Sequence, residues 1–536
     1  MTHTTRPVTM GANGMVASPH YLASIAGLEI LQEGGSAVDA TIAVNSTLGV
    51  VYPHMTGMGG DAFWLIHDAR SGAVHALNGS GRTAAAACRD LYRNLGHRVI
   101  PIRGPLAAIT MPGAVDSWCK AHERFGRLPL TRVLEPAIRY AREGYPVSPG
   151  QARFTEATAE VLMQHPETQR TFMPDNRAPR AGEVMQNRNL ADTMELVARH
   201  GRAGFYEGKV RDEMVRAVRE SGGCWQPEDL SKHHGTWEKP ISTTYRQDYT
   251  CYQHPPNCQG FVHLMMLNIL EQFDLAGIGD GHPDYVHLAA EATKLAFIDR
   301  DRYLTDPDIC DVPIPLDRLL SKEYAAELAR SIDLTRARST DPQPVGQHTT
   351  CTVAVDGDGN AVSMIQSIYH EFGSGVVAGS TGVLLQNRGS FFSLLDDHVN
   401  RLEPGKRCFH TLMPGMLFRD DKPFLVYGTM GGEGQPQTST ALVTRVVDFG
   451  QDVQTAIDQP RWLYGRTWGE ESRSLRVESR IGEAEAADLK ARGHDVQVVG
   501  PWSDVMGHAA AIQIDQSTGV LHGAADARGD GIAVGW

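Results

Sequence analysis

Gln347-His-Thr-Thr-Cys-Thr-Val-Ala-Val-Asp-Gly-Asp-Gly-Asn360 is the stretch of sequence on which the fold depends. Apolar residues alternate with other residues from Cys351 to Val355, which is the period-2 pattern of a half-buried β-strand. The run Asp356–Gly359 then predicts a tight turn into a second strand, Ala361–Ile365. We therefore expect a β-hairpin in this part of the chain.

Thr349 lies at the start of this hairpin, after a charged connector with two prolines, Asp333–Gly346. A threonine hydroxyl is a weak nucleophile unless a base lies beside it. Cleavage of the His348–Thr349 bond would place a new α-amine, with a reference pKa of roughly 7.7–8.0, next to the hydroxyl of the same residue. Thr349 could then supply both nucleophile and base. From spacing alone, the alternative that Thr349 and Thr350 simply begin an edge strand is the stronger one.

Further motifs are distributed along almost the whole chain. They are Ala23–Ala40, Thr56–Asp61, Ala290–Asp308, Phe372–Gly379, Gly382–Asn387, Gly428–Gly432 and Ala456–Arg461. Together with Thr349–Val362, these motifs resemble the γ-glutamyltranspeptidase family. Its members are N-terminal-nucleophile (Ntn) hydrolases, made as one chain that cuts itself before the nucleophilic threonine. The resemblance implies that Thr349 is the nucleophile and that the chain is cleaved between His348 and Thr349.

The resemblance also implies the architecture. We expect an α+β fold, a four-layer αββα sandwich with one core shared by two processed chains. Residues 1–348 would form the large chain, and residues 349–536 the small chain. The two would assemble as a heterodimer, with a dimer of heterodimers as a further possibility.

Local patterns predict individual elements of this fold. Residues 20–33 show a helical apolar stripe that ends at two glycines, and Ser36 is placed to cap a second helix through Leu48. Ala62–Ile66 reads as a strand. Charges surround an apolar stripe from Glu291 to Arg302, which predicts a helix with a solvated face.

Composition limits the classes of partner and compartment. The 536 residues carry a formal net charge of −13, which argues against nucleic-acid and anionic-membrane partners. No apolar run of about 18 residues is present, and the first ten residues contain no signal-peptide pattern. The eight cysteines are scattered, so we expect reduced thiols in a cytoplasmic protein. No residues have metal-ligand spacing, and we expect neither a metal nor another cofactor.

The resemblance assigns catalytic support to three residues. Ser367 stands where the family has a threonine that supports the nucleophile's hydroxyl. Gly431 and Gly432 stand where backbone N–H groups stabilise the oxyanion, a role that glycine suits because it permits close approach. The alternative for two adjacent glycines is an ordinary turn.

Substrate-binding positions depart from the family. Tyr369 replaces an asparagine, Phe391 an aspartate, Arg388 a glutamine, and His410 and Thr411 a pair of serines. A substrate ammonium placed against Phe391 would lose its charge partner, which is costly in a buried site. The pocket therefore favours a short acyl group that bears a carboxylate and no α-amine.

Arginine suits a planar, bidentate grip on a carboxylate. Arg388 is the first candidate and Arg82 the second, with His370 or His410 nearby. For Arg82, a surface salt bridge is the alternative.

One branch of the family fits these departures. The similarity lies in Val51–Gly57, Ile102–Ala108, Gln366–Phe372, Gln386–Arg388 and Arg461–Gly469, which are similar to the oxamate amidohydrolase branch of purine catabolism. We therefore expect a self-processing amidohydrolase whose substrate is a small amide such as oxamate, cleaved through an acyl-threonine intermediate. A γ-glutamyltransferase or glutathione hydrolase, a cephalosporin-acylase-like amidase and an unprocessed binding homologue remain alternatives.

Overall fold

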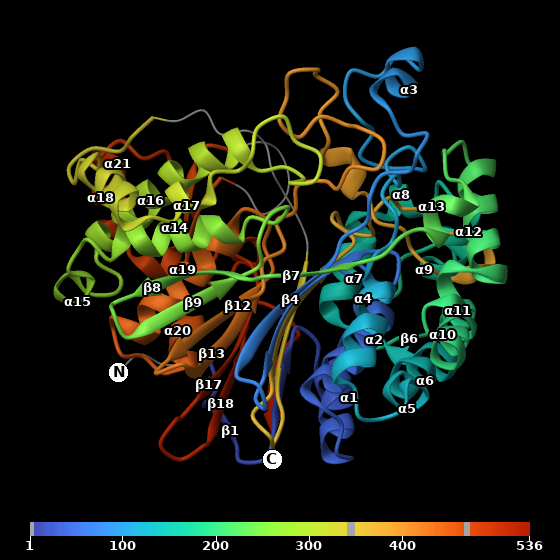
Figure 1. Cartoon of the computed structure of the whole chain (residues 1–536), viewed down its shortest axis with the longest axis horizontal. Helices are drawn as coiled ribbons and strands as arrows, with labels where there is room; N and C mark the ends of the chain where they lie inside the picture. Colours follow the sequence, from blue (N-terminus) through green and yellow to red (C-terminus); the bar gives the residue numbers. More distant parts are fainter. Residues whose placement is uncertain (1–4, 340–348, 466–471) are drawn as a thin grey trace.

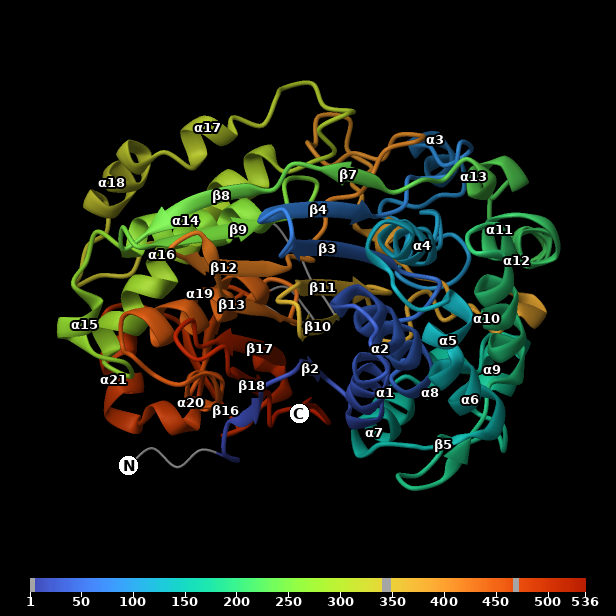
Figure 2. The same cartoon turned by 60° about the horizontal axis from the view of Figure 1, so that its bottom comes forward.

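Two antiparallel β-sheets form the centre of the protein in the computed structural model, which describes residues 5–339, 349–465 and 472–536. Sheet I has the strand order β19 (Ile532–Gly535), β2 (Met15–Ser18), β10 (Thr350–Val355), β11 (Ala361–Ser367), β3 (Asp61–Asp68), β4 (Ala73–Gly79), β7 (Thr236–Glu238). Sheet II has the order β1 (Thr9–Gly11), β18 (Leu521–Ala525), β17 (Ala509–Ile514), β13 (Lys422–Thr429), β12 (Gly415–Arg419), β9 (Tyr249–Gln253), β8 (Ile241–Tyr245). In Figure 2 the strands of both sheets follow one another from top to bottom.

Helices cover the outer face of each sheet (Figure 1). On the side of sheet I, α1 (Tyr21–Gln32), α2 (Ala37–Val51) and α4 (Ala114–Phe125) pack against the strands, and α6 (Glu135–Glu143), α10 (Arg188–His200) and α12 (Gly208–Glu220) lie outside them. Those beside sheet II are α14 (Gly260–Leu270), α16 (Pro283–Tyr303), α19 (Gly434–Val447) and α20 (Val453–Asp458). The predicted four-layer αββα sandwich is confirmed.

Shorter elements complete the described residues. The helices are α3 (Arg89–Asn94), α5 (Leu130–Val133), α7 (Pro149–Ala157), α8 (Ala159–Leu162), α9 (Pro166–Phe172), α11 (Ala203–Tyr206), α13 (Pro227–Ser231), α15 (Leu275–Ile278), α17 (Leu316–Leu319), α18 (Lys322–Arg330) and α21 (Glu483–Ala491). The 3-10 turns are η1 (Gly379–Thr381), η2 (Arg388–Phe391), η3 (Ser479–Ile481) and η4 (Asp504–Met506). Two small sheets comprise β5 (Tyr145–Pro146) with β6 (Val184–Met185), and β14 (Trp462–Tyr464), β15 (Leu475–Glu478) and β16 (Val496–Val499).

The predicted hairpin is β10–β11, with Thr350 opposite Gln366 and Val355 opposite Ala361. Asp356 stabilises the turn, because its Oδ1 accepts hydrogen bonds from the backbone N–H groups of Asp358 and Asn360. The expectation of a half-buried strand is wrong, since all of β10 is buried. One face of β10 packs in the core between the sheets, and the other packs under the helices beside sheet I.

The first two helices agree with their sequence patterns. Ser36 and Asp39 form a capping box at the start of α2, in which each side chain accepts a hydrogen bond from the other residue's backbone N–H. Ala62–Ile66 lies within β3, as predicted.

The prediction of a solvated face on the helix from Glu291 is wrong. Glu291, Lys294 and Arg300 of α16 are buried, because α16 lies between α14 on one side and α21 with β14 on the other. Most of the helix is therefore covered, with Ile298 and Arg302 exposed near its end, and the three buried charges are paired inside the protein. Lys294 Nζ lies 2.7 Å from Glu291 Oε1, and Arg300 pairs with Glu433.

Strands from residues before and after position 349 alternate in both sheets. In sheet I, β10 and β11 lie between β2 and β3, and in sheet II, β12 lies beside β9. Neither part could keep its sheets without the other, which agrees with one shared core. Among residues 5–339, 349–465 and 472–536, no helix combines the length and apolar character needed to cross a membrane.

Candidate active site

Thr349 lies directly before β10 and is fully buried. The pairing of Thr350 with Gln366 places Thr349 opposite Ser367, the last residue of β11. Ser367 is in turn paired with Asp61 at the start of β3. The ends of three central strands of sheet I therefore meet at the predicted nucleophile. His348, on the other side of the predicted cleavage point, and the connector from residue 340 lie outside the described residues.

The loop between β13 and α19 approaches Thr349 from sheet II. Gly431 and Gly432 have φ values of 133° and 53°, in a region that favours glycine. The side chain of Gln435, in the first turn of α19, donates a hydrogen bond from Nε2 to Thr349 Oγ at 3.4 Å. Thr349 is thus close to the N-terminus of a 14-residue helix, where the partial positive charge favours developing negative charge.

Ser367 lies at the same end of the sheet. Its Oγ accepts a hydrogen bond from the backbone N–H of Tyr369 at 2.8 Å. Gly60 packs so closely here that an added Cβ would lie 2.2 Å from the Ser367 carbonyl oxygen. Glycine at position 60 therefore lets the Thr56–Asp61 motif reach the end of β11.

Arg388 is buried beside this group without a hydrogen-bonding partner. None of its three side-chain nitrogens has one among the residues that the structure describes. Its guanidinium stacks on Tyr369, with Cζ 3.9 Å from the ring centroid, and burial lowers its pKa. Leaving hydrogen-bond donors and a charge unpaired in the interior is costly. This guanidinium is therefore placed to receive an anion.

His410 and Asp61 lie near Arg388. His410 Nε2 is 3.1 Å from Asp61 Oδ2, and burial together with Arg388 lowers the pKa of His410 to about 4. His410 is therefore neutral at pH 7. The other oxygen of Asp61 accepts hydrogen bonds from the backbone N–H of Gly81 and from Gln386 Nε2, both at 2.9 Å.

Thr411 and Gly432 are joined by one buried side chain. Nε2 of Gln259 donates to the carbonyl oxygens of both residues at 3.0 Å. The hydroxyl of Thr411 has no hydrogen-bond partner in the described part of the chain. The predicted oxyanion loop and the predicted substrate loop are thus held at a fixed separation.

Aromatic side chains form one wall beside Arg388. Phe391 is half-buried and packs edge-to-face on Tyr369 and on Phe409, with ring centroids 6.1 and 5.2 Å apart. His370 contacts the Tyr369 ring edge-to-face, with ring centroids 4.6 Å apart, and is held by Asn387, whose Nδ2 lies 2.7 Å from His370 Nδ1. The two side chains that Phe391 packs on are therefore both aromatic.

Arg82, the other candidate for binding a carboxylate, is paired within the protein. Its guanidinium lies 3.0 Å from Asp306 and 2.5 Å from Asp308, and it donates to the carbonyl oxygen of Gly405. The two candidate arginines therefore differ in kind: Arg82 has carboxylate partners, and Arg388 has none.

A model of the family described as gamma-glutamyltranspeptidase matches residues 23–536. The chain belongs to the γ-glutamyltranspeptidase family. Relatives of this family member include the glutathione hydrolase-like YwrD proenzyme of Bacillus subtilis (strain 168), which is 51% identical over 526 residues, or 98% of this chain and 99% of the relative. The oxamate amidohydrolase proenzyme of Klebsiella pneumoniae is 41% identical over 535 residues, with the same coverage.

Among solved structures, cephalosporin acylase from Bacillus halodurans superposes with a TM-score of 0.92 at 39% identity, covering 100% of this chain and 98% of that one. This family member is therefore a hydrolase with the Ntn fold. The glutathione hydrolase-like relative is more similar to it than the oxamate amidohydrolase is, so identity alone does not select the substrate.

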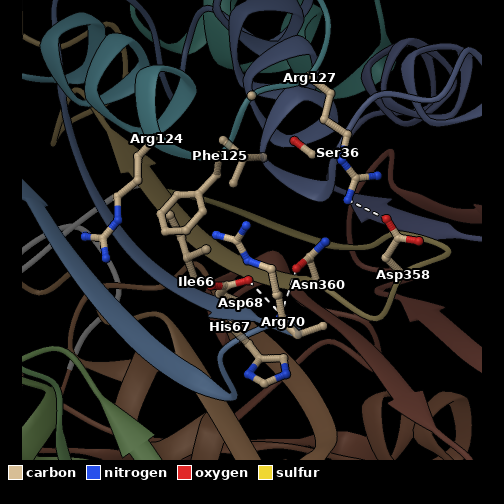
Figure 3. A pocket seen from close by; sticks show the side chains of 13 residues that line it. Ser36, Ile66, His67, Asp68, Arg70, Arg124, Phe125, Arg127, Asp358 and Asn360 are labelled. Atoms are coloured by element: carbon tan, nitrogen blue, oxygen red, sulfur yellow. Dashed lines mark hydrogen bonds and ion pairs between the residues drawn. The ribbon is translucent and has the colours of Figure 1, made fainter.

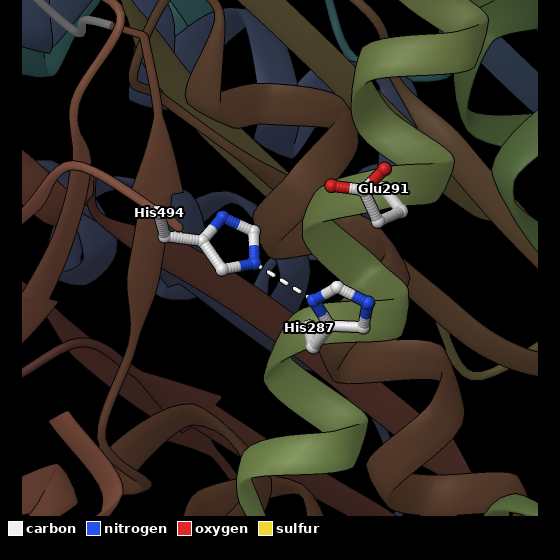
Figure 4. A group of neighbouring side chains, drawn as sticks. All are labelled: His287, Glu291 and His494. Atoms are coloured by element: carbon white, nitrogen blue, oxygen red, sulfur yellow. Dashed lines mark hydrogen bonds between the residues drawn. The ribbon is translucent and has the colours of Figure 1, made fainter. Parts of the chain in front are cut away.

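One group of side chains in this family member has the residue types of a metal site: His287 and Glu291 of α16 with His494 (Figure 4). His287 Nδ1 lies 2.8 Å from His494 Nε2. Two nitrogens bound to one tetrahedral zinc ion at ordinary bond lengths are about 3.3 Å apart. Glu291 also accepts a hydrogen bond from the Lys294 ammonium. As they lie, these groups bind one another.

The same group fastens the segment that leads towards the predicted cleavage point. The Asp333 carbonyl oxygen lies 2.9 Å from His287 Nε2. The backbone N–H of Arg338 donates to Glu291, and its carbonyl oxygen accepts from Lys294 Nζ at 2.9 Å. These contacts indicate that the buried side chains of His287, Glu291 and Lys294 hold the segment from Asp333 to Arg338 in place.

A cavity of about 470 Å³ lies at the opposite end of the β10–β11 hairpin (Figure 3). Arg70, Arg124 and Arg127 contribute to its lining, and Arg127 is paired with Asp358. It contains none of the predicted site residues and is separated from Thr349 by the length of β10.

Gln435 and Phe409 were not predicted as neighbours of the site, whereas Gln259 belongs to the run Pro255–Gly260, which resembles a turn that the family carries near its active site. Asp61 belongs to a motif that carried the family resemblance, and this was the available signal for it. Gln435 carries no local pattern, because a lone glutamine near a helix start is common in any protein.

Proposed function

We propose that this protein is a self-processing threonine-nucleophile amidohydrolase that cleaves a small carboxylate-bearing amide such as oxamate. The observation that carries the substrate class is Arg388, a buried guanidinium without a hydrogen-bond partner in the described residues. Oxamate has a carboxylate bonded directly to its amide carbonyl. A carboxylate on Arg388 would satisfy the donors that the protein leaves unpaired.

The reaction begins with cleavage between His348 and Thr349, which gives chains of residues 1–348 and 349–536. Thr349 Oγ then attacks the amide carbonyl while the new α-amine takes its proton. Backbone N–H groups of Gly431 and Gly432, helped by the α19 N-terminus, stabilise the oxyanion. The nitrogen takes the proton and leaves as ammonia, and water hydrolyses the acyl-threonine ester.

Side chains around Arg388 support selection against a γ-glutamyl group. Phe391 offers no charge partner to a substrate ammonium, and the nearby cation Arg388 repels one. Tyr369 holds Arg388 by stacking, while His410, neutral beside Asp61, can donate or accept a hydrogen bond without adding charge. Ser367, which follows Gln366 at the end of β11, would support the nucleophile.

The test is the intact mass of the purified wild type and of Thr349→Ala, followed by measurement of ammonia release from oxamate. We expect two fragments that meet at His348/Thr349 and ammonia release in the wild type, and an uncut, inactive chain in Thr349→Ala. An uncut wild type without activity would support the binding-homologue alternative and overturn the proposal. A cleaved wild type that releases no ammonia would overturn the substrate.

Glutathione or another γ-glutamyl compound is the second candidate substrate. It is favoured by the 51% identity to a glutathione hydrolase-like protein, and an acylase substrate by the likeness to cephalosporin acylase. Release of p-nitroaniline from γ-glutamyl-p-nitroanilide, with and without an acceptor dipeptide, distinguishes hydrolysis from transfer. Activity on this compound without activity on oxamate would move the protein to the γ-glutamyl class.

The compartment is part of the same proposal. All eight cysteines are free thiols, and burial raises the pKa of six of them, to about 11 or 12 in Cys119, Cys224, Cys251 and Cys408 and further in Cys258 and Cys351. Buried, protonated thiols support a reducing, cytoplasmic location, as a step of purine catabolism would need.

A further inference from the structure

We infer that Gln435 is a catalytic residue of this reaction, whose side-chain amide donates a hydrogen bond to Thr349 Oγ and stabilises negative charge on that oxygen when the acyl ester breaks. The inference rests on the proposed role of Thr349 as nucleophile. Its geometric basis is the contact between Gln435 Nε2 and Thr349 Oγ, 3.4 Å long and buried.

The orientation of the Gln435 amide is set by its surroundings. Its Oε1 accepts a hydrogen bond from the backbone N–H of Met413 at 3.2 Å. A backbone N–H can only donate, so the oxygen of the amide faces Met413 and the NH₂ group faces Thr349. Since Nε2 can only donate, Oγ accepts this bond, and its own proton is left to point elsewhere, as transfer to the α-amine requires.

The backbone of Gln435 belongs to the predicted oxyanion loop. Its N–H donates to the carbonyl oxygen of Gly432 at 3.2 Å, and the residue lies in the first turn of α19. Gln435 therefore connects three parts of the site: the nucleophile, the Gly431–Gly432 loop, and Met413, which follows His410 and Thr411.

The charge on Oγ decides which chemical step needs this donor most. In acylation, Oγ loses its proton to the α-amine and ends as a neutral ester oxygen, while the amide nitrogen leaves with a proton. In deacylation, water adds to the ester carbonyl, the C–Oγ bond breaks, and Oγ leaves carrying the electron pair until the α-ammonium returns the proton. A hydrogen-bond donor at Oγ stabilises this second departure. Loss of the donor therefore slows deacylation more than acylation.

Gln437 on the same helix provides a matched control. It is also buried, and its Nε2 donates to the carbonyl oxygens of Glu433 and Tyr464 at 3.0 and 2.9 Å. Its Oε1 accepts from the backbone N–H of Tyr464. Gln437→Met thus removes a buried amide of similar burial and connectivity that has no role at Thr349.

The test uses processed wild type, Gln435→Met, Gln435→Glu and Gln437→Met, each mixed separately with oxamate and with γ-glutamyl-p-nitroanilide. Steady-state rates and the intact mass of the small chain are recorded during turnover. Removal of one oxyanion-hole donor costs about 10²–10³ in kcat, and for this longer contact we expect kcat to fall roughly 10- to 100-fold in both Gln435 variants. With the compound that the wild type turns over, the acyl adduct on the small chain accumulates; if that compound is γ-glutamyl-p-nitroanilide, p-nitroaniline appears as a burst.

The outcomes separate this inference from the proposed function. An active wild type with Gln435→Met matching Gln437→Met, and no acyl adduct in either, overturns the role of Gln435 and leaves Thr349 as nucleophile. A wild type that is uncut and inactive on both compounds overturns both. Gln435→Met could fail to yield processed protein. In that case the same adduct measurement is made on Gln435→Glu, which keeps the size of the side chain and the oxygen that accepts from Met413, and its result decides whether Gln435 has the inferred role.

Discussion

At the scale of single residues, the site is defined by side chains whose bonding is incomplete inside the protein. Arg388 is buried on the Tyr369 ring without a hydrogen-bond partner in the described residues, whereas Arg82 is held by Asp306 and Asp308. An unpaired buried charge lowers stability. The arrangement is therefore best explained by an anionic ligand that binds there, at a cost in stability of the free protein.

Replacement of Arg388 by methionine is expected to lower the activity and to maintain or raise the stability of the folded protein. A hydrogen bond to a charged group contributes about 1.5–3 kcal/mol, so kcat/KM for oxamate falls roughly 10- to 100-fold in Arg388→Met. Because the variant removes an unpaired buried charge, its unfolding midpoint in urea is equal to or above that of the wild type. Arg82→Met is expected to lower the urea unfolding midpoint instead, because it removes the partner of Asp306 and Asp308. Unchanged kcat/KM in Arg388→Met would show that the carboxylate is bound elsewhere.

At the scale of elements, the site forms where the β10–β11 hairpin of sheet I meets α19, a helix that packs beside sheet II. β10–β11 presents Thr349 and Ser367, and α19 presents the Gly431–Gly432 loop and Gln435. Arg300 of α16 fixes the start of α19, since its guanidinium is buried 3.1 Å from Glu433 and 3.7 Å from the Phe297 ring. A helix that precedes position 349 thus holds the loop to which we assign the oxyanion role.

Breaking the Arg300–Glu433 pair is expected to destabilise the protein by about 3–5 kcal/mol in Arg300→Met, which removes the buried cation, and by less in Glu433→Gln, where Asp301 Oδ1 still lies 2.8 Å from Arg300 Nε. Arg300→Met, Glu433→Gln and the double variant form a cycle that urea unfolding can measure. The double variant should be more stable than the sum of the single losses predicts. Strict additivity of the two losses would mean that the pair is not coupled.

At the scale of the whole molecule, two sheets built from alternating segments enclose many buried ionisable groups. Five histidines have a pKa that burial lowers to about 3 or 4, namely His20, His233, His263, His410 and His494. Each is neutral in the folded protein at pH 5. In the unfolded chain each has a pKa of about 6.5 and takes up a proton there.

Stability is therefore expected to depend on pH on the acid side of neutrality. The folded-state pKa values lie below the unfolded value, so the contribution of these histidines is complete above about pH 6.5 and is lost as the pH falls towards 4. Each can remove up to about 1.4 kcal/mol per pH unit in this window. Urea unfolding at pH 7, 6 and 5 should show a steep decline. A flat profile over this range would mean that these histidines are protonated in the folded state.

Much of the local structure could be predicted from short stretches of sequence. The hairpin followed from alternation and a glycine-rich turn, and the start of α2 followed from Ser36 before an apolar run. These features depend on interactions between residues a few positions apart, so a short stretch contains most of the information. The buried charges of α16 could not be predicted in this way, since the pattern of a helix does not reveal that most of its surface is covered.

The sequence by itself determined the family, the four layers and the position of Thr349 before a central strand. Only the tertiary structure distinguished Arg388 from Arg82 and brought Gln435 to Thr349 from 86 positions away. The reason is physical: the chemistry of an arginine or a glutamine depends on which partners surround it and on how far water is excluded. Both are decided by segments distant in the chain that the two sheets bring together.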